Sequence, residues 1–288
     1  MAIAQPLIRS VPTRPLEFDA WLDDLPKYFA ADDAIVMSHV LAVLSSVFPD
    51  GEDYFVRSVE AVRDRIDDPR LRRDVDGFIG QESMHGREHR VLNERLAELG
   101  YPTRAIGTYV RRVTAFRERV SGQKGNLAFT AALEHYTATL AQVLLTDPEA
   151  RAMFDVDEVR AMFIWHALEE SEHKAVAFDV FEAVSGSYLI RVGVMQAITF
   201  GFILSVAGHT AQSMVLDPAA RDLGRLGRSL ARLRHSPWLK PEVLAQLLAY
   251  SRRGFHPDDR DTSDLIAHWR AELFGTDGPL ADRLQHAG

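Results

Sequence analysis

The sequence contains no cysteine among its 288 residues. This absence excludes cysteine nucleophiles, disulfides, iron–sulfur clusters and zinc–thiolate sites, and it is typical of a protein kept in a reducing compartment. Any bound metal ion must therefore be held by histidine, aspartate or glutamate side chains. Basic residues are also in the minority, since 33 Lys and Arg stand against 41 Asp and Glu. The resulting net charge of −8 is the wrong sign for a general nucleic-acid binder, so no nucleic-acid partner is expected.

Long apolar runs are scarce as well. The amino terminus has prolines and arginines where a secretory signal needs an unbroken apolar stretch, which predicts a cytoplasmic protein. The most apolar segment, residues 192–208, is 17 residues long, the lower limit for crossing a bilayer. An amphipathic stretch follows, with a stripe formed by Arg221, Arg225, Arg228 and Arg232. We expect 192–208 to cover the protein's own core, with peripheral membrane contact as the alternative.

The hydrophobic pattern is helical along most of the chain. Apolar residues recur at spacings of three and four, and the period-two alternation of strands is almost absent. The pattern predicts long helices over 34–47, 50–66, 69–99, 105–119, 126–146, 155–185 and 188–211, and shorter ones near 217–233, 239–252 and 262–274. The sequence therefore predicts an all-α fold. Residues 1–211 would form a bundle with an N-terminal lead-in, and residues 212–288 a helical extension packed on it.

Two of these predicted helices carry clustered metal-binding residue types. The segment FIGQESMHGREH places Glu82, His85 and His89 at i, i+3 and i+7, within about 60° of one another on a helix. The segment WHALEESEHKAV repeats this arrangement with His166, Glu170 and His173. Either cluster alone is more typical of a solvated helix face. Both contain ExxH, with which ferritin-like dimetal bundles project a glutamate and a histidine inward from each of two helices.

Such a site needs one further glutamate from each of two other helices. Glu52 in FPDGEDYF and Glu134 in FTAALEHYTA have apolar neighbours and precede Glu82 and Glu170 by 30 and 36 residues, which suits antiparallel helix pairs. The predicted ligands of a dinuclear site are thus Glu52, Glu82, His85, Glu134, His166, Glu170 and His173, with His89 as a further candidate. Oxygen and nitrogen donors without thiolate favour two iron ions, or manganese with iron.

Other polar residues near these clusters have ordinary explanations. Glu88 and Glu172 point roughly 120° away from the two metal-binding faces, which predicts that they face solvent. Glu169 lies at the edge of its face and is ambiguous. His135 is expected to pack in the core or support a ligand, and His256 to stabilise a turn.

Five motifs, in order, carry a family resemblance: FPDGEDYF, FIGQESMHGREH, LEHYTATLA, WHALEESEHKAVAFDV and RRGFHPDD. With them the sequence resembles, over about residues 10–260, a bacterial family described as predicted metal-dependent hydrolases and related to ferritin-like dimetal proteins. In addition, His166, Glu170 and His173 match the HxxxExxH helix of the non-haem diiron arylamine N-oxygenases. That resemblance implies that His166 is an iron ligand, and it offers no counterpart for His89.

Three functional hypotheses follow from these residues. The first is a diiron oxygenase or oxidase that activates dioxygen, oxidises a small apolar organic substrate and receives electrons from a donor such as a ferredoxin or its reductase. The second is a metal-dependent hydrolase that uses metal-activated water. The third is a non-enzymatic metal-binding or storage protein, which would require a closed oligomeric shell. For the enzymes we expect a homodimer.

Overall fold

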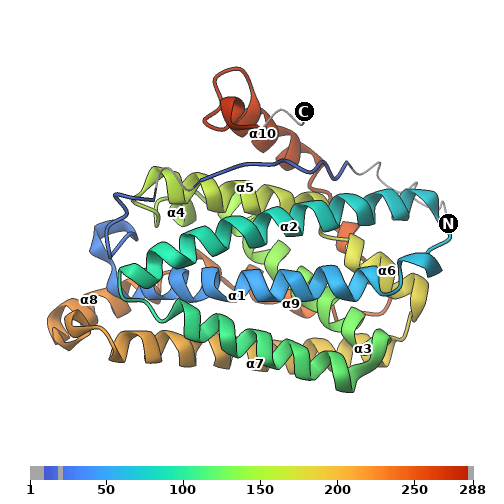
Figure 1. Cartoon of the computed structure of the whole chain (residues 1–288), viewed down its shortest axis with the longest axis horizontal. Helices are drawn as coiled ribbons and strands as arrows, with labels where there is room; N and C mark the ends of the chain where they lie inside the picture. Colours follow the sequence, from blue (N-terminus) through green and yellow to red (C-terminus); the bar gives the residue numbers. More distant parts are fainter. Residues whose placement is uncertain (1–9, 19–21, 285–288) are drawn as a thin grey trace.

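The computed structural model describes residues 10–18 and 22–284, and these residues form an all-α protein without β-strands, as predicted. The bundle in Figure 1 is built from α1 (Ile35–Glu60), α2 (Pro69–Glu98), α3 (Thr103–Thr146), and the consecutive pair α5 (Asp157–His173) and α6 (Val176–Val184). Helix α7 (Tyr188–Val215) packs outside the bundle against α1 and α3. The predicted domain boundary at residue 211 therefore falls inside a helix.

Shorter elements cover the ends and sides of this bundle. The short helices are α4 (Pro148–Arg151), α8 (Leu223–Leu233), α9 (Pro241–Ala249) and α10 (Ser263–Phe274). The 3-10 turns are η2 (Ala31–Asp33), η3 (Arg63–Arg65), η4 (Pro218–Arg221), η5 (Pro237–Leu239), η6 (Pro257–Asp259) and η7 (Ala281–Arg283). Helix α8 packs on α1, α9 on α3 and α10 on α5. The segment 10–18 crosses the same side of the bundle as α10 (Figure 1).

Helix α1 continues through Pro49, so the predicted break between the helices 34–47 and 50–66 is wrong. Proline lacks the backbone N–H that would bond to the carbonyl four residues earlier, which belongs to Ser45. The side-chain amide of Asn93 donates to that carbonyl instead, at 2.9 Å. The helix therefore tolerates the proline, and Glu52 lies on a continuous helix rather than at the start of a new one.

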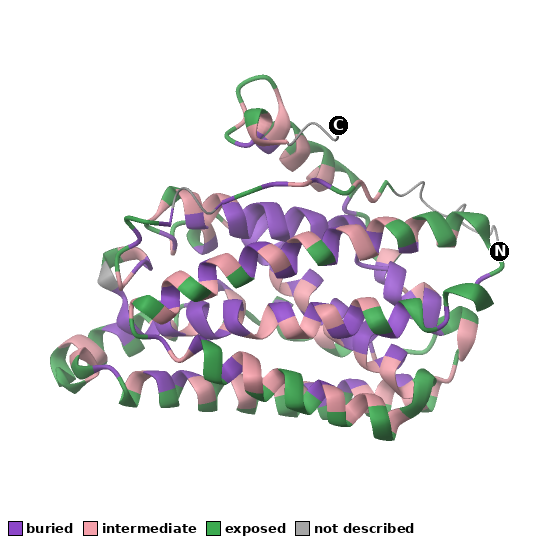
Figure 2. Cartoon of the chain, in the orientation of Figure 1, coloured by how far each residue is buried: buried purple, intermediate pink, exposed green. Residues whose placement is uncertain are grey.

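The predicted break between 105–119 and 126–146 is confirmed, because Gly122, with a φ of 62°, separates two helical segments within α3. A further predicted boundary differs from the structure. The single helix predicted over 155–185 is instead divided between α5 and α6, immediately after His173. Residues 162–178 of this pair are all buried, and Figure 2 shows the part of α5 after its first turn in the colour of buried residues. This helix has no solvent face along most of its length.

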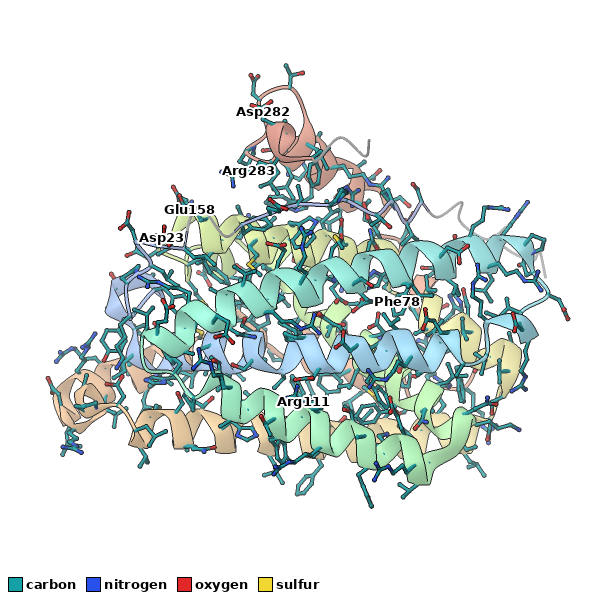
Figure 3. All side chains as sticks on the ribbon, in the orientation of Figure 1. Asp23, Phe78, Arg111, Glu158, Asp282 and Arg283 are labelled. Carbon is teal, nitrogen blue, oxygen red and sulfur yellow. The ribbon has the colours of Figure 1, made fainter. Side chains whose placement is uncertain are left out.

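Two apolar clusters fill the bundle on either side of its middle. One contains Leu41, Leu92 and Trp165, and the other contains Tyr54, Phe78 and Phe181. Figure 3 shows side chains filling the space between the ribbons, with Phe78 of α2 labelled. The predicted metal-binding residues lie between the two clusters, where apolar packing on both sides keeps water away from them.

Candidate metal centre

The seven predicted ligand side chains converge in the middle of the bundle. Helix α1 contributes one, α2 two, α3 one and α5 three: Glu52; Glu82 and His85; Glu134; His166, Glu170 and His173. None of the seven residues is more than 4% exposed. Four glutamates and three histidines therefore share one buried region. Burying so many ionisable groups costs folding free energy unless they are paired or bind a metal ion.

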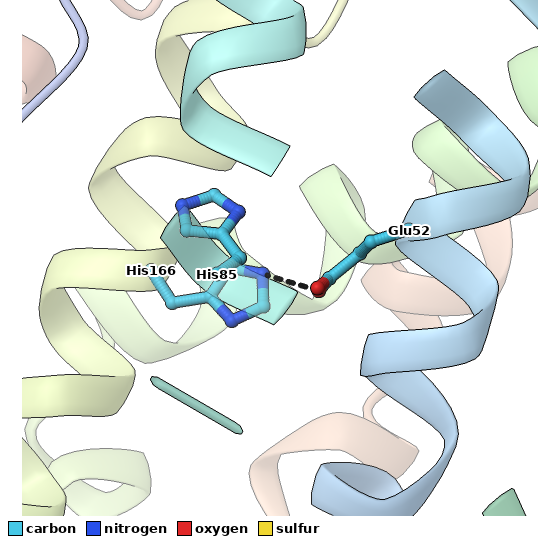
Figure 4. Close-up of side chains that lie close together, drawn as sticks. All are labelled: Glu52, His85 and His166. Atoms are coloured by element: carbon cyan, nitrogen blue, oxygen red, sulfur yellow. Dashed lines mark ion pairs between the residues drawn. The ribbon is translucent and has the colours of Figure 1, made fainter. Parts of the chain in front are cut away.

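One group of potential ligands consists of Glu52, His85 and His166, from three different helices. One ligand atom from each lies within 4.8 Å of the other two. The Nε2 atom of His166 is 3.6 Å from Oε1 of Glu52, the ion pair drawn in Figure 4. The imidazole rings of His85 and His166 stack with centroids 4.0 Å apart. This group could hold one metal ion.

A second group consists of Glu82, Glu170 and His173, whose ligand atoms likewise lie within 4.8 Å of one another. The Nε2 atom of His173 is 3.1 Å from Oε1 of Glu82 and 3.6 Å from Oε2 of Glu170. Glu134 joins this group, because its Oε2 atom is 3.3 Å from the same nitrogen. This group could hold a second ion.

Two carboxylates connect the groups. Oε1 of Glu170 is 3.0 Å from Nε2 of His166, while its Oε2 faces His173. Glu82 faces His173 and also lies 3.9 Å from Nδ1 of His85. Both side chains are placed to bridge two ions, so the two groups form one site with two positions.

The donor atoms fit metal ions because many of them have no other partner. Both carboxylate oxygens of Glu52, Glu82 and Glu134 are buried without a hydrogen bond, as are Nδ1 of His85 and Nε2 of His173. Buried polar atoms in folded proteins are nearly always paired. Lone pairs that face one another in a buried region are an arrangement that cations can satisfy.

The protonation equilibria show the same excess of negative charge. Burial raises the pKa values of Glu52, Glu82 and Glu134, and neighbouring carboxylates add to the shift at Glu52 and Glu134. Burial opposes ionisation of Glu170 too, but the hydrogen bond with His166 and the nearby imidazole of His173 bring its pKa well below the ordinary value. The four carboxylates thus carry more negative charge than the neighbouring histidines can balance. Divalent metal ions would supply the missing positive charge.

A comparison with known families decides where this chain belongs. A family model described as "Predicted metal-dependent hydrolase" matches residues 12–261. The chain belongs to this family. The match includes every residue of the candidate site. No curated protein and no solved structure matched the chain.

In this member of the predicted metal-dependent hydrolase family, two of the histidines are oriented by side chains behind them. Nε2 of His85 is 3.0 Å from Oε2 of Glu169, and Nδ1 of His173 donates to Oε1 of Gln81 at 2.8 Å. In each ring the nitrogen turned away from the site has the partner, so the other nitrogen faces the site. Such partners fix the tautomer and ring orientation of metal-binding histidines.

His89 lies behind His166 rather than among the donor groups. Its Nε2 atom is 2.8 Å from Nδ1 of His166, and its Nδ1 atom is 2.9 Å from Oγ of Ser45. The ring of Phe48 packs against both imidazoles, at centroid distances of 4.7 and 4.8 Å. His89 is thus placed to orient His166.

The prediction that Glu88 and Glu172 face solvent is wrong, because both are buried. Segment 10–18 and α10 cover this side of α2 and α5. The backbone N–H of Phe18 donates to Glu88 at 2.9 Å. Glu172 accepts hydrogen bonds from Arg14, Gln81 and Arg270. A helical projection cannot detect covering segments that come from the two ends of the chain.

Arg14 and Glu169 support the candidate metal centre, a role that the sequence did not predict for either residue. Arg14 donates to Oε1 of Glu169 at 2.7 Å, while the other oxygen of that carboxylate faces His85. Burial raises the pKa of Glu169 to about 7, with Arg14 partly offsetting the shift. Arg14 is 155 residues from Glu169 in sequence, and its local surroundings contain no signal of this role.

The other two histidines considered from the sequence, His135 and His256, have structural roles, as predicted. His135 is 3.0 Å from the carbonyl oxygen of Gln246, and burial lowers its pKa to about 4. His256 accepts a hydrogen bond from the backbone N–H of Asp258 at the start of η6, and it lies 2.8 Å from Asp179.

We expect Glu172→Ala to destabilise the protein. The substitution leaves the buried guanidinium of Arg14 with one carboxylate partner fewer and removes an acceptor from Gln81, which orients His173. Breaking a buried ion pair typically costs about 3 kcal/mol of unfolding free energy. Urea unfolding measures the change, and Glu149→Ala, at an exposed carboxylate, is the control. Equal stability of the two variants would contradict the buried network.

Proposed function

We propose that this chain is a dinuclear metal hydrolase. Its substrate would be a small molecule with a carbonyl or phosphoryl group that water attacks. The observation that supports the proposal most strongly is the set of unpaired, buried donor atoms around two linked positions. Membership of a family named for predicted metal-dependent hydrolysis supports the type of reaction.

The residues of the chain would hold the ions and control their surroundings. Two bound ions would lower the pKa of a water molecule and polarise the bond to be cleaved. Glu82 and Glu170 face both positions and would keep the ions together. The rings of Phe78 and Trp165 pack against His173 and His85, at 5.1 and 5.0 Å, and exclude bulk water from that side.

A second candidate function is dioxygen activation, and the composition and burial of the donors favour it. Carboxylate and imidazole donors without thiolate suit iron, or manganese with iron. Side chains no more than 4% exposed suit a reactant as small as dioxygen. This function would require an apolar organic substrate and an electron donor such as a ferredoxin or its reductase.

The two candidates differ in their need for oxygen. We would load the protein anaerobically with Fe(II), Mn(II) or Zn(II), measure metal content, and test cleavage of a panel of carboxylic and phosphoric esters. Metal-dependent cleavage without oxygen, lost in Glu170→Ala and retained in Asp157→Ala, is the result expected for the hydrolase. Asp157 lies on the same helix, with its side chain 78% exposed.

Other outcomes would reject the hydrolase. If the iron-loaded protein cleaves nothing but changes its optical spectrum and oxidises an apolar substrate when oxygen is admitted, dioxygen activation is the function. If it only accumulates iron within a closed multi-subunit shell, storage is the function. A protein that binds no metal under any of these conditions would overturn all three.

A further inference from the structure

Helix α7 is apolar yet mostly exposed. It has no Asp, Glu, Lys or Arg between Arg191 and Asp217, and among the described residues it is long and apolar enough to cross a membrane. Only 17% of its most apolar 18-residue stretch is buried in the protein. Phe200 is 71% exposed, and Ile203 and Leu204 beside it are exposed as well. Figure 2 shows exposed residues recurring along the whole helix. It is therefore not a core helix.

The first half of α3 extends this apolar surface. Four exposed side chains are spaced four, three and four residues apart, which places them on one helix face: Tyr109, Val113, Phe116 and Val120. The ring of Tyr109 is 4.9 Å from that of His209 on α7, so this face borders α7. Figure 1 shows the two helices side by side along one edge of the molecule, with α8 at the end of α7.

We call the exposed residues of α7, of α8 and of the first half of α3 the α3–α7–α8 surface. Soluble monomers rarely expose a continuous apolar surface that runs over several helices unless it binds a partner.

The charge of the same segments is opposite to that of the whole protein. Residues 103–124 and 188–235 contain 12 Lys or Arg and 3 Asp or Glu, a net charge of +9 in a chain whose total is −8. Arg191 is the one of these basic residues that is buried, so the surface itself remains strongly basic.

On α8, Arg228 and Arg232 are exposed beside Arg225 along a cleft of about 180 Å³. Asp32 lines the same cleft and lies 3.2 Å from Arg232, which leaves the cleft with an excess of positive charge. On α3, Arg111 is exposed on the side of the surface next to α1, where Figure 3 labels it, and lies 3.8 Å from Asp50. Apolar side chains with arginines around them are typical of a surface that binds anionic lipid.

We propose that the α3–α7–α8 surface docks on a membrane rich in anionic lipid. Helix α7 would lie in the plane of the membrane, because its other face is packed into the protein. Arg191 on that face donates to the carbonyl oxygens of Tyr250 and Arg252, and Met195 and Ile198 are buried. The charge of the surface favours lipid over a second copy of the chain, because two copies would bring their basic flanks together.

Vesicle flotation tests this proposal with the full-length, metal-loaded protein. We expect it to float with phosphatidylcholine vesicles that contain about one third phosphatidylglycerol, and far less with phosphatidylcholine alone. Raising the salt from about 0.1 M to about 1 M should weaken binding, because the Debye length falls from about 10 Å to about 3 Å.

Three variants separate the apolar and basic contributions. Phe200→Glu combined with Ile203→Glu should abolish flotation. Arg228→Ala combined with Arg232→Ala should weaken binding to the anionic vesicles roughly 10- to 30-fold. Leu244→Glu is the control, since Leu244 is also exposed but lies on α9, which packs against the other half of α3. Unchanged metal content would show that each variant is folded and that the candidate metal centre is intact.

Two results would overturn the proposal. One is failure of the unmodified protein to float with the anionic vesicles. The other is equal loss of flotation in the Leu244→Glu control. A dimer in light scattering that dissociates on Phe200→Glu, together with absent flotation, would assign the surface to a second copy of the chain instead.

Discussion

Glu170→Ala should leave the protein with less than one metal ion per chain after reconstitution, where the unmodified protein should hold two. The substitution removes the one carboxylate whose two oxygens face His166 on one side and His173 on the other. Loss of a shared ligand should weaken both positions by more than the roughly 10- to 100-fold that is typical when a supporting residue is lost. Elemental analysis after gel filtration measures the metal content.

Thermal unfolding gives a second measurement on the same variant. Ions that bind only the folded state stabilise it, by about 2.7 kcal/mol when free metal is at 100 times the dissociation constant. Added metal should therefore raise the melting temperature of the unmodified protein and of Asp157→Ala, and should have little effect on Glu170→Ala. Full metal content in Glu170→Ala would contradict the bridging position of this side chain.

His166→Ala should remove one of the two ions, whereas His89→Ala should retain both with weaker affinity. Nε2 of His166 faces Glu52 and Glu170 within the site, but both nitrogens of His89 are taken up by His166 and Ser45. Loss of the orienting ring should reduce metal affinity about 10- to 100-fold. Competition with a chelator of known affinity measures both variants.

Ser45→Ala is the control for this pair, because Ser45 forms a hydrogen bond with His89 and acts on His166 only through that ring. Its effect should be smaller than that of His89→Ala. A larger loss in His89→Ala than in His166→Ala would reverse the assignment of the two histidines, and it would remove the parallel with the HxxxExxH helix.

The sequence alone was sufficient for the fold class and for the residues that meet in the centre. Glutamate and histidine three residues apart lie on one helix face whatever surrounds the helix, because helix geometry sets that direction. Glu82 with His85 and Glu170 with His173 could therefore be paired before any tertiary contact was known. Glu52 and Glu134 followed from the number of ligands that a ferritin-like dimetal site needs and from their spacing, and the structure places both beside the pairs.

Helix boundaries were less predictable where a tertiary contact replaces a lost backbone bond. Pro49 removes one helical hydrogen bond, and the local sequence therefore predicts a break between two helices. Asn93, on another helix, satisfies the free carbonyl of Ser45, and α1 continues. No local pattern contains this information, because the compensating group lies 48 residues away.

Glu172 and Glu169 show what only the tertiary structure decided. Helical spacing gives the direction of a side chain, but whether that direction leads to water depends on which other segments pack there. Here segment 10–18 and α10 cover α5, Arg14 forms ion pairs with both carboxylates, and Arg270 pairs with Glu172 as well. The same reasoning applies in reverse to α7, whose apolar sequence predicts burial although the structure leaves most of it exposed. Sequence periodicity determined which residues share a face, and packing between distant segments decided what each face meets.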